Sequence, residues 1–178
     1  MKYLALLRGV NVGGKNILPM AKLREVLEDT ELNNVKTYIQ SGNVIFDSDT
    51  RDKRKLEELI AKVIRENFEI NADVVVYKQS EWQAVIDNAP SWWGKDSAWK
   101  HNIIVMIHPY EINDVVRAYG GLKPEIEEMK QGDGVLYQSL SLAKFGRTTG
   151  GKLAGGNPYY KQMTIRNFNT ATKLAKLF

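Results

Sequence analysis

The first 78 residues alternate between β-rich and helical segments in an order that limits the folds open to this chain. Strands are predicted at 3–7, 35–39, 44–46 and 73–77, and helices at 19–29 and about 50–68. The longer helix carries apolar residues at the three- and four-residue spacing of one helix face. They are Leu56, Leu59, Ile60, Val63 and Ile64. The order β-α-β-β-α-β is typical of the ferredoxin-like fold, so we predict an α+β protein with a ferredoxin-like N-terminal half.

Turn and capping signals mark the boundaries of these segments. Asn33-Asn34 predicts a turn before the second strand, and Ser41-Gly42-Asn43 predicts a tight hairpin turn after it. Ser48-Asp49-Thr50 offers a side-chain oxygen for the N-cap of the second helix.

The second half of the chain shows the same order of elements more weakly. The predicted elements are a helix at 80–88 capped by Ser80, an apolar strand at 102–107, a helix opened by Pro109 and a hairpin at 125–140. A loop or poorly ordered helix at 144–158, a short strand at 163–165 and a terminal helix at 168–178 follow. We therefore predict two subdomains, 1–79 and 80–178. The second is expected to be smaller, α+β and built like the first, and its basic C-terminal segment is expected to pack back on the first.

The composition excludes several classes of site. The chain has no cysteine, which excludes disulfides, thiolate zinc sites and cysteine nucleophiles. His101 and His108 fall at opposite ends of one predicted strand, too far apart to share a metal, so no metal site and no cofactor are predicted. No apolar run reaches the roughly 18 residues of a membrane span, and Arg8 interrupts the apolar N-terminus too early for a signal peptide. We therefore expect a cytoplasmic protein without a membrane partner.

Charge is distributed unevenly along the chain. Residues 1–78 carry 13 basic and 12 acidic side chains, and residues 79–139 carry 5 and 9. Residues 140–178 carry 7 basic side chains and no acidic one, although the net charge of the whole chain is only +4. Such a segment indicates a surface that faces an anionic partner. The alternative is a solvated basic face that only aids solubility.

A glycine-rich segment at 8–16, here called the 8–16 loop, lies between the first strand and the first helix. It fits the first seven positions of a phosphate-binding P-loop, but Asn16 at the eighth lacks the hydroxyl that holds Mg²⁺. Ile17-Leu18-Pro19 also delays the helix whose N-terminus would face the phosphates. A similar segment at 146–152 fails at the same position, which is Leu153. These departures argue against nucleotide hydrolysis.

Two interpretations of the 8–16 loop stay open. The backbone amides of Gly13 and Gly14, with the cations Arg8 and Lys15, would form a looser cradle for an anion. Alternatively, the glycines only allow a tight connection from strand to helix.

The turn at 40–43, here called the 40–43 turn, joins the second and third strands. Strands one and three of a ferredoxin-like sheet are antiparallel neighbours, so the end of the first meets the start of the third. We therefore expect Ser41 and Asn43 to face the 8–16 loop. The alternative is that Gly42-Asn43 only provides good turn chemistry.

Nucleic-acid binding is a separate alternative, because RNA-recognition domains with this fold stack bases on aromatic residues of their sheet. Tyr3 and Phe46 fall on the corresponding strands, but residues 41–48 lack the basic-glycine-aromatic signature of those domains. We interpret Trp92, Trp93 and Trp99 as packing anchors between the two halves rather than as a stacking surface.

Three blocks of sequence resemble the signature blocks of the bacterial family filed as domain of unknown function 1697. They are residues 8–16, 37–46 and 164–170, so the resemblance extends over the whole chain. The departures are Phe168, where the family has Trp, and residues 29–31, where it has a glycine. The resemblance implies a two-part α+β fold with a ferredoxin-like first half, and it implies no activity. It also implies that the three blocks matter together.

Together these observations predict that a small anionic or phosphate-bearing ligand binds in a cleft formed by the 8–16 loop, the 40–43 turn and Arg166-Asn167. Arg8, Lys15 and Arg166 would neutralise charge, and the Gly13 and Gly14 amides would cradle oxygens. Asn11, Ser41, Asn43 and Asn167 would orient the ligand. The alternatives are an RNA- or DNA-binding module that uses the basic 140–178 surface and a protein-interaction scaffold. No catalytic residue, reaction or oligomeric state is predicted.

Overall fold

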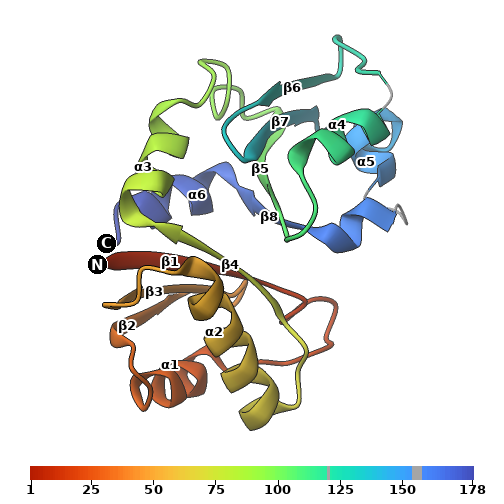
Figure 1. Ribbon diagram of the computed structural model, residues 1–178. Helices are drawn as coiled ribbons and strands as arrows, with labels where there is room; N and C mark the ends of the chain where they lie inside the picture. The colour runs from red at the N-terminus through yellow and green to blue at the C-terminus, as the bar shows by residue number, and fades with distance from the viewer. Residues whose placement is uncertain (120, 154–157) are drawn as a thin grey trace. The chain divides into compact units, whose positions relative to one another are not determined.

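The computed structural model describes residues 1–119, 121–153 and 158–178, which form a mixed α+β fold with two four-stranded antiparallel sheets (Figure 1). The chain divides into two compact units, Met1–Gln83 with Leu174–Phe178, and Ala84–Lys173. The second unit is as long as the first rather than smaller, and the predicted boundary between residues 79 and 80 stays a prediction. Within the described residues, no helix has the length and apolar character needed to cross a membrane.

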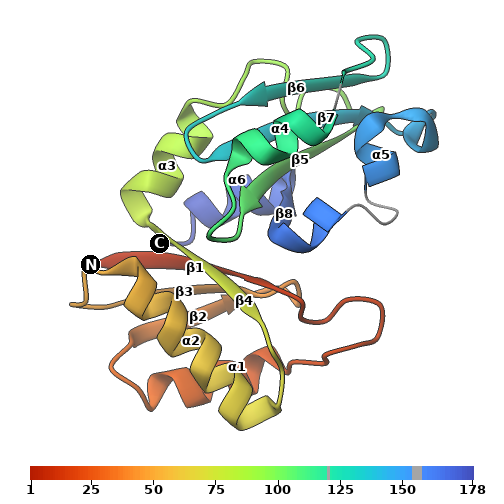
Figure 2. The ribbon, with the colours of Figure 1, turned by 45° about the vertical axis from the view of Figure 1, so that its right-hand side comes forward.

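The first unit follows the predicted order of elements. They are β1 (Lys2–Arg8), α1 (Met20–Glu28), β2 (Asn33–Tyr38), β3 (Asn43–Asp47), α2 (Lys53–Phe68) and β4 (Asp73–Lys78), with α3 (Gln79–Asp87) directly after β4. The strands are antiparallel in the order β2-β3-β1-β4. Figure 2 shows α1 and α2 on one face of this sheet.

An apolar core fills the space between this sheet and its two helices. Tyr3, Ala5 and Leu7 alternate along β1 and pack in one cluster with Leu56 and Ile60 of α2. The rings of Tyr3 and Phe46 stack 5.6 Å apart inside this core, and they are 0% and 1% exposed. The idea that these two aromatic residues stack bases is therefore wrong, because both point toward the helices and are covered by them.

The second unit repeats the strand order of the first. Its elements are β5 (Trp99–Met106), α4 (Ile112–Tyr119), β6 (Glu127–Gln131), β7 (Val135–Ser141), the short helices η1 (Phe145–Arg147), α5 (Thr149–Leu153) and η2 (Pro158–Gln162), β8 (Met163–Asn167) and α6 (Phe168–Ala175). The sheet order β6-β7-β5-β8 corresponds strand by strand to β2-β3-β1-β4. The weak repeat seen in the sequence thus extends to the complete topology of the sheet.

Three local boundary predictions are wrong. Asp52, not 48–50, caps α2: its side chain accepts a hydrogen bond of 3.0 Å from the Arg54 amide, because only the residue directly before the helix reaches the first free amides. Asn34 lies inside β2 with a φ of 51°, at a register shift rather than in a turn. Ser80 is inside α3, which starts one residue earlier.

Trp93 anchors the second unit from within. Its indole nitrogen donates a 2.9 Å hydrogen bond to the Asn102 carbonyl. Its ring packs edge-on against Tyr137 at 5.4 Å and against Phe168 at 4.9 Å. All three partners belong to the same unit as Trp93.

Candidate functional site

The tip of the 8–16 loop is a tight hairpin turn. The Lys15 amide donates to the Val12 carbonyl over 3.0 Å, and Gly13 and Gly14 between them have φ values of 58° and 73°. Two consecutive residues with positive φ are typical of a type I′ turn, which accounts for both glycines. No atom lies within 4 Å of a Cβ built at either glycine, so the tip is open to solvent.

Asn11 holds this loop against the 40–43 turn. Its side-chain nitrogen donates to the carbonyls of Leu18 and Gln40 over 2.9 and 2.8 Å, and its oxygen accepts from the Leu18 amide over 2.8 Å. The expected meeting of the loop and the turn is confirmed by these bonds and by the pairing of Leu6 with Asn43. Because the Asn11 amide is used on backbone groups, its observed role is to position the loop.

The 40–43 turn is closely packed. The buried Asn43 donates to the Tyr38 carbonyl over 2.9 Å and to the Ser41 hydroxyl over 3.1 Å. A Cβ at Gly42, where φ is 75°, would lie 2.7 Å from Leu7 Cβ and 2.8 Å from Val10 Cγ2. Ser41 and Asn43 are thus brought beside the loop, as expected, with their side chains bonded to each other.

The predicted cations have different surroundings. Arg8 Nη1 lies 3.9 Å from the Asp73 carboxylate, with 23% of the Arg8 side chain exposed. Lys15 is exposed next to the open glycine tip. Arg166 is buried, donates to the Thr164 hydroxyl over 2.8 Å and to the Ile165 carbonyl over 2.9 Å, and burial lowers its pKa to about 10.

Arg166 and Asn167 point to opposite faces of β8, because successive side chains of a strand alternate. Asn167 accepts a 2.8 Å hydrogen bond from the Thr170 amide, as an N-cap of α6 does. Both residues belong to the second unit, whereas the 8–16 loop belongs to the first. Their joint cleft stays a prediction.

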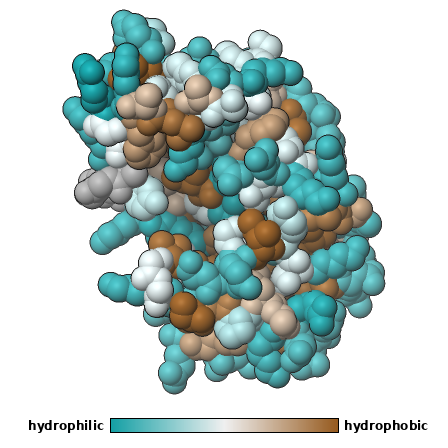
Figure 3. All heavy atoms as spheres, turned by 180° about the vertical axis from the view of Figure 1, so that it is seen from behind, coloured by the Kyte–Doolittle hydropathy of each residue, from teal (hydrophilic) through white to brown (hydrophobic). Residues whose placement is uncertain are grey.

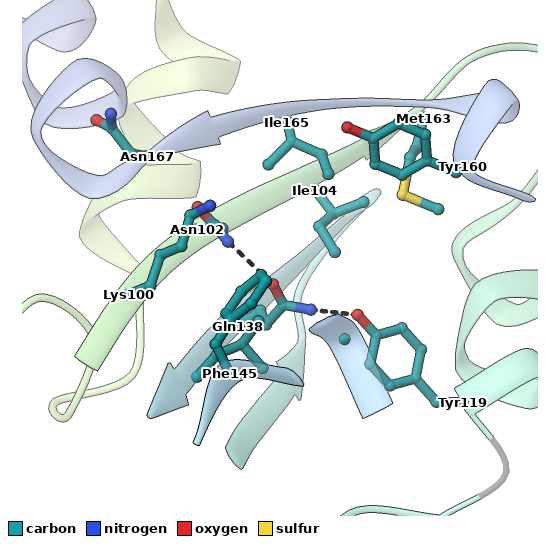
Figure 4. Close-up of a pocket in the computed structure, with 12 residues that line it drawn as sticks. Lys100, Asn102, Ile104, Tyr119, Gln138, Phe145, Tyr160, Met163, Ile165 and Asn167 are labelled. Atoms are coloured by element: carbon teal, nitrogen blue, oxygen red, sulfur yellow. Dashed lines mark hydrogen bonds between the residues drawn. The ribbon is translucent and has the colours of Figure 1, made fainter. Parts of the chain in front are cut away.

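The second unit contains a pocket of about 310 Å³ that the sequence analysis missed (Figure 4). It lies on the face of the second sheet that carries α4 and α5. Its polar lining residues are Lys100, Asn102, Tyr119, Gln138, Tyr160 and Asn167, and its apolar walls include Ile104, Met163 and Ile165. Asn167 is the one predicted site residue in this lining. The signal available in the sequence was weak, because Asn102 follows Lys100 and His101 in β5, and Gln138 precedes Ser139 in β7.

Three buried polar side chains in this pocket form a chain of hydrogen bonds. Asn102 Nδ2 donates to Gln138 Oε1 over 3.0 Å, and Gln138 Nε2 donates to the Tyr119 hydroxyl. Their exposed fractions are only 5%, 4% and 7%. Burial, and to a lesser extent the Glu127 carboxylate, raise the pKa of Tyr119 far above its ordinary value, so the phenol stays protonated.

The charge of the lining is positive. Lys100 is its cation, and no carboxylate is among the described residues that line it. The Lys100 ammonium lies 5.2 Å from the centre of the Phe145 ring, a cation–π distance. The nearby Glu127 is committed elsewhere, since it accepts from the Thr149 amide over 2.7 Å and from the Thr149 hydroxyl over 2.8 Å.

The helix of this unit that corresponds to α2 is short. In the first unit the 16-residue helix α2 covers the sheet, whereas the corresponding α5 has five residues. α5 approaches the sheet closely at Gly150, where a Cβ would lie 2.7 Å from Gln138 Nε2. The remainder of the face is left for the pocket.

The described residues contain no group of three His, Cys, Asp or Glu side chains that could hold a metal ion. On the face shown in Figure 3, apolar residues are interspersed among polar ones. The 8–16 loop and the pocket are therefore the two candidate sites.

Comparisons with known proteins agree with the sequence blocks. No curated protein matches the chain. The chain is similar to the solved structure of conserved bacterial protein SP0830 from Streptococcus pneumoniae, with 28% identity and a TM-score of 0.86 over 98% of this chain and 97% of that chain. Residues 1–137 match the family described as protein of unknown function (DUF1697). This range includes two of the three blocks and most of the chain, and the chain therefore belongs to the DUF1697 family.

Proposed function

We propose that this protein binds a small anionic ligand in the pocket of its second unit. The observation that carries the proposal is a pocket of about 310 Å³ whose described lining residues include a cation and buried hydrogen-bonding side chains but no carboxylate. Small-molecule sites of proteins combine apolar walls with a few convergent polar groups, at volumes of roughly 300–1,000 Å³. A small anion is also the ligand class that the sequence predicts, but the site proposed here is the pocket and not the 8–16 loop.

Lys100 is the residue that favours an anion. Its ammonium, held near the Phe145 ring, is available to phosphate or carboxylate oxygens. A hydrogen bond to a charged group contributes roughly 1.5–3 kcal/mol. Because Lys100 is exposed, solvent weakens this contribution, and we expect about a tenfold effect on affinity.

Calorimetric titration with inorganic phosphate, phenyl phosphate and benzoate tests the proposal. We expect Lys100→Gln to weaken binding about tenfold, and Lys55→Gln, on exposed α2 surface, to leave it unchanged. Bound ligand at 100 times its Kd should also stabilise the fold by about 2.7 kcal/mol. Absence of binding by every probe, or equal binding by Lys100→Gln, contradicts the proposal.

The 8–16 loop is a second candidate for anion binding. Its support is the set of Asn11 hydrogen bonds that hold the loop, with the open glycine tip next to the exposed Lys15. Asn11, Ser41 and Asn43 would then hold the loop rather than contact the ligand, and the contribution of Arg166 and Asn167 remains part of the original hypothesis. Lys15→Gln should weaken anion binding if this site operates, and Lys100→Gln should then have no effect.

Nucleic-acid binding by the basic 140–178 segment stays an alternative proposal. Its support is the charge of that segment alone, since Tyr3 and Phe46 are buried. Binding to phosphate backbones falls steeply as salt rises. Fluorescence anisotropy with single-stranded RNA at 50 and 200 mM salt would separate this behaviour from small-ligand binding.

We also propose that each unit is ferredoxin-like. The support is the order β-α-β-β-α-β together with a four-stranded antiparallel sheet in the order β2-β3-β1-β4, repeated as β6-β7-β5-β8.

A further inference from the structure

The direction of the hydrogen-bond chain in the pocket restricts what a ligand can offer it. Gln138 Oε1 accepts from Asn102, and Gln138 Nε2 donates to Tyr119, so the Gln138 amide is committed at both ends (Figure 4). Because the Tyr119 oxygen accepts from Gln138, its own proton is left to point at a different acceptor. Among the described residues, the hydrogen bond of this hydroxyl is the one that it accepts from Gln138.

A buried hydroxyl that lacks an acceptor carries a cost, which an acceptor on a ligand would remove. Tyr119 is 7% exposed and lines the pocket, so its hydroxyl is a fixed donor at that site. The phenol ring is held by its place in the apolar cluster with Val115 and Leu136. The donor is therefore preorganised, which lowers the entropic cost of using it.

Lys100, which would bind the anion, and the Tyr119 hydroxyl come from different elements of the fold. Lys100 lies on β5 two residues before Asn102, on the same face of the strand, and Tyr119 lies at the last residue of α4. Gln138 on β7 bonds to both Asn102 and Tyr119. It therefore separates Tyr119 from the end of the hydrogen-bond series that lies nearer to Lys100. A ligand that uses both ends needs two different groups.

Resting on the proposed function, we propose that the pocket selects small anions that also carry an uncharged hydrogen-bond acceptor, a carbonyl oxygen or a ring nitrogen, which receives the Tyr119 hydroxyl proton. Lys100 pairs with the phosphate or carboxylate. Ile104 and Ile165 contact the apolar body between the two groups. Anions that consist of charged oxygens on a hydrocarbon body are bound more weakly, because they leave the Tyr119 donor unused.

Matched aromatic acids test this selectivity, because benzoate and the three pyridinecarboxylates differ only in one ring nitrogen. We expect at least one pyridinecarboxylate to bind the wild type about tenfold more tightly than benzoate, the value of one net hydrogen bond. Tyr119→Phe should abolish that preference, so that benzoate and that pyridinecarboxylate bind this variant with equal affinity. The exposed Tyr110→Phe serves as the control and should keep the preference.

A second variant guards against misfolding of Tyr119→Phe. Gln138→Leu leaves the Tyr119 hydroxyl in place but removes the bond that directs it, and should reduce the preference without removing benzoate binding. If anions bind in a Lys100-dependent way but no pyridinecarboxylate is preferred, or if the preference survives Tyr119→Phe, this inference is wrong and the proposed function stands. If neither benzoate nor any other anion binds, both are wrong.

Discussion

The two units of this protein have sheets of the same strand order but differ in what covers the helical face. In the first, the sheet side chains on that face are apolar, such as Ala5, Phe46 and Val76, and the 16-residue helix α2 packs on them. In the second, Asn102 and Gln138 occupy that face and the five-residue helix α5 leaves a pocket. One topology therefore holds a filled core in one unit and a candidate binding site in the other.

The largest expected effect tests the filled core. Ile60→Ala removes a side chain that is 0% exposed under α2, and should lower the free energy of unfolding by about 2–5 kcal/mol through lost burial and a new cavity. Lys152→Ala in the short α5 should change it by less than about 0.5 kcal/mol. Urea denaturation followed by tryptophan fluorescence measures both, and similar values would remove the contrast between the two helices.

The corresponding hairpin turns of the two units differ in how closely they are packed. Gly42 and Gly134 have φ values of 75° and 66°, but only Gly42 is crowded, while no atom lies within 4 Å of a Cβ at Gly134. Gly42→Ala should cost about 2–4 kcal/mol, from backbone strain plus overpacking. Gly134→Ala should cost about 1–2 kcal/mol from strain alone. Equal shifts of the denaturation midpoint would show that the packing of the 40–43 turn is unimportant.

Replacing the polar pair Asn102 and Gln138 should have a smaller effect on stability, and the effect depends on whether one or both residues are replaced. Asn102→Leu leaves Gln138 Oε1 without its donor in a buried site and should cost about 1–3 kcal/mol. The double variant Asn102→Leu/Gln138→Leu makes the second sheet face resemble the first, and should recover most of that loss. A thermal double-mutant cycle measures the coupling. Purely additive effects would contradict the hydrogen-bond chain.

The smallest effect concerns high pH. Burial raises the pKa of Tyr119 in the folded protein, whereas an unfolded tyrosine loses its proton near pH 10. The stability that this group contributes is therefore present below pH 10 and is lost as the pH rises above it. At pH 11 the wild type should have lost about 1 kcal/mol more than Tyr119→Phe, relative to pH 8. Parallel stability curves for the two proteins would be inconsistent with a buried phenol.

Much of the fold follows from local periodicity. The stripe from Leu56 to Ile64 predicts α2, and the apolar segments at 3–7 and 73–77 predict the paired strands β1 and β4. Cap positions follow less well, because the cap is whichever residue stands directly before the first helical turn. Asp52 therefore takes the role expected of 48–50.

The features of the candidate sites likewise differ in whether the sequence predicts them. The glycines of the 8–16 loop and the 40–43 turn are readable in sequence because left-handed backbone favours glycine wherever it occurs. The role of Asn11 is not readable, since its partner Gln40 is distant along the chain and only strand pairing brings it near. The pocket is still less accessible to sequence, because Asn102 and Gln138 stand among other polar residues of β5 and β7, and only strand pairing brings them together with Tyr119 of α4.

The amino-acid order alone thus predicts most of the elements and their order, because these depend on neighbours within a few residues, and the blocks spread along the chain indicate the family. The tertiary structure alone decides which sheet face is covered by a closely packed helix and which borders a pocket. It also decides that Tyr119, Gln138 and Asn102 meet. Those outcomes depend on packing between elements that are far apart in the chain, and burial then raises the pKa of the Tyr119 phenol.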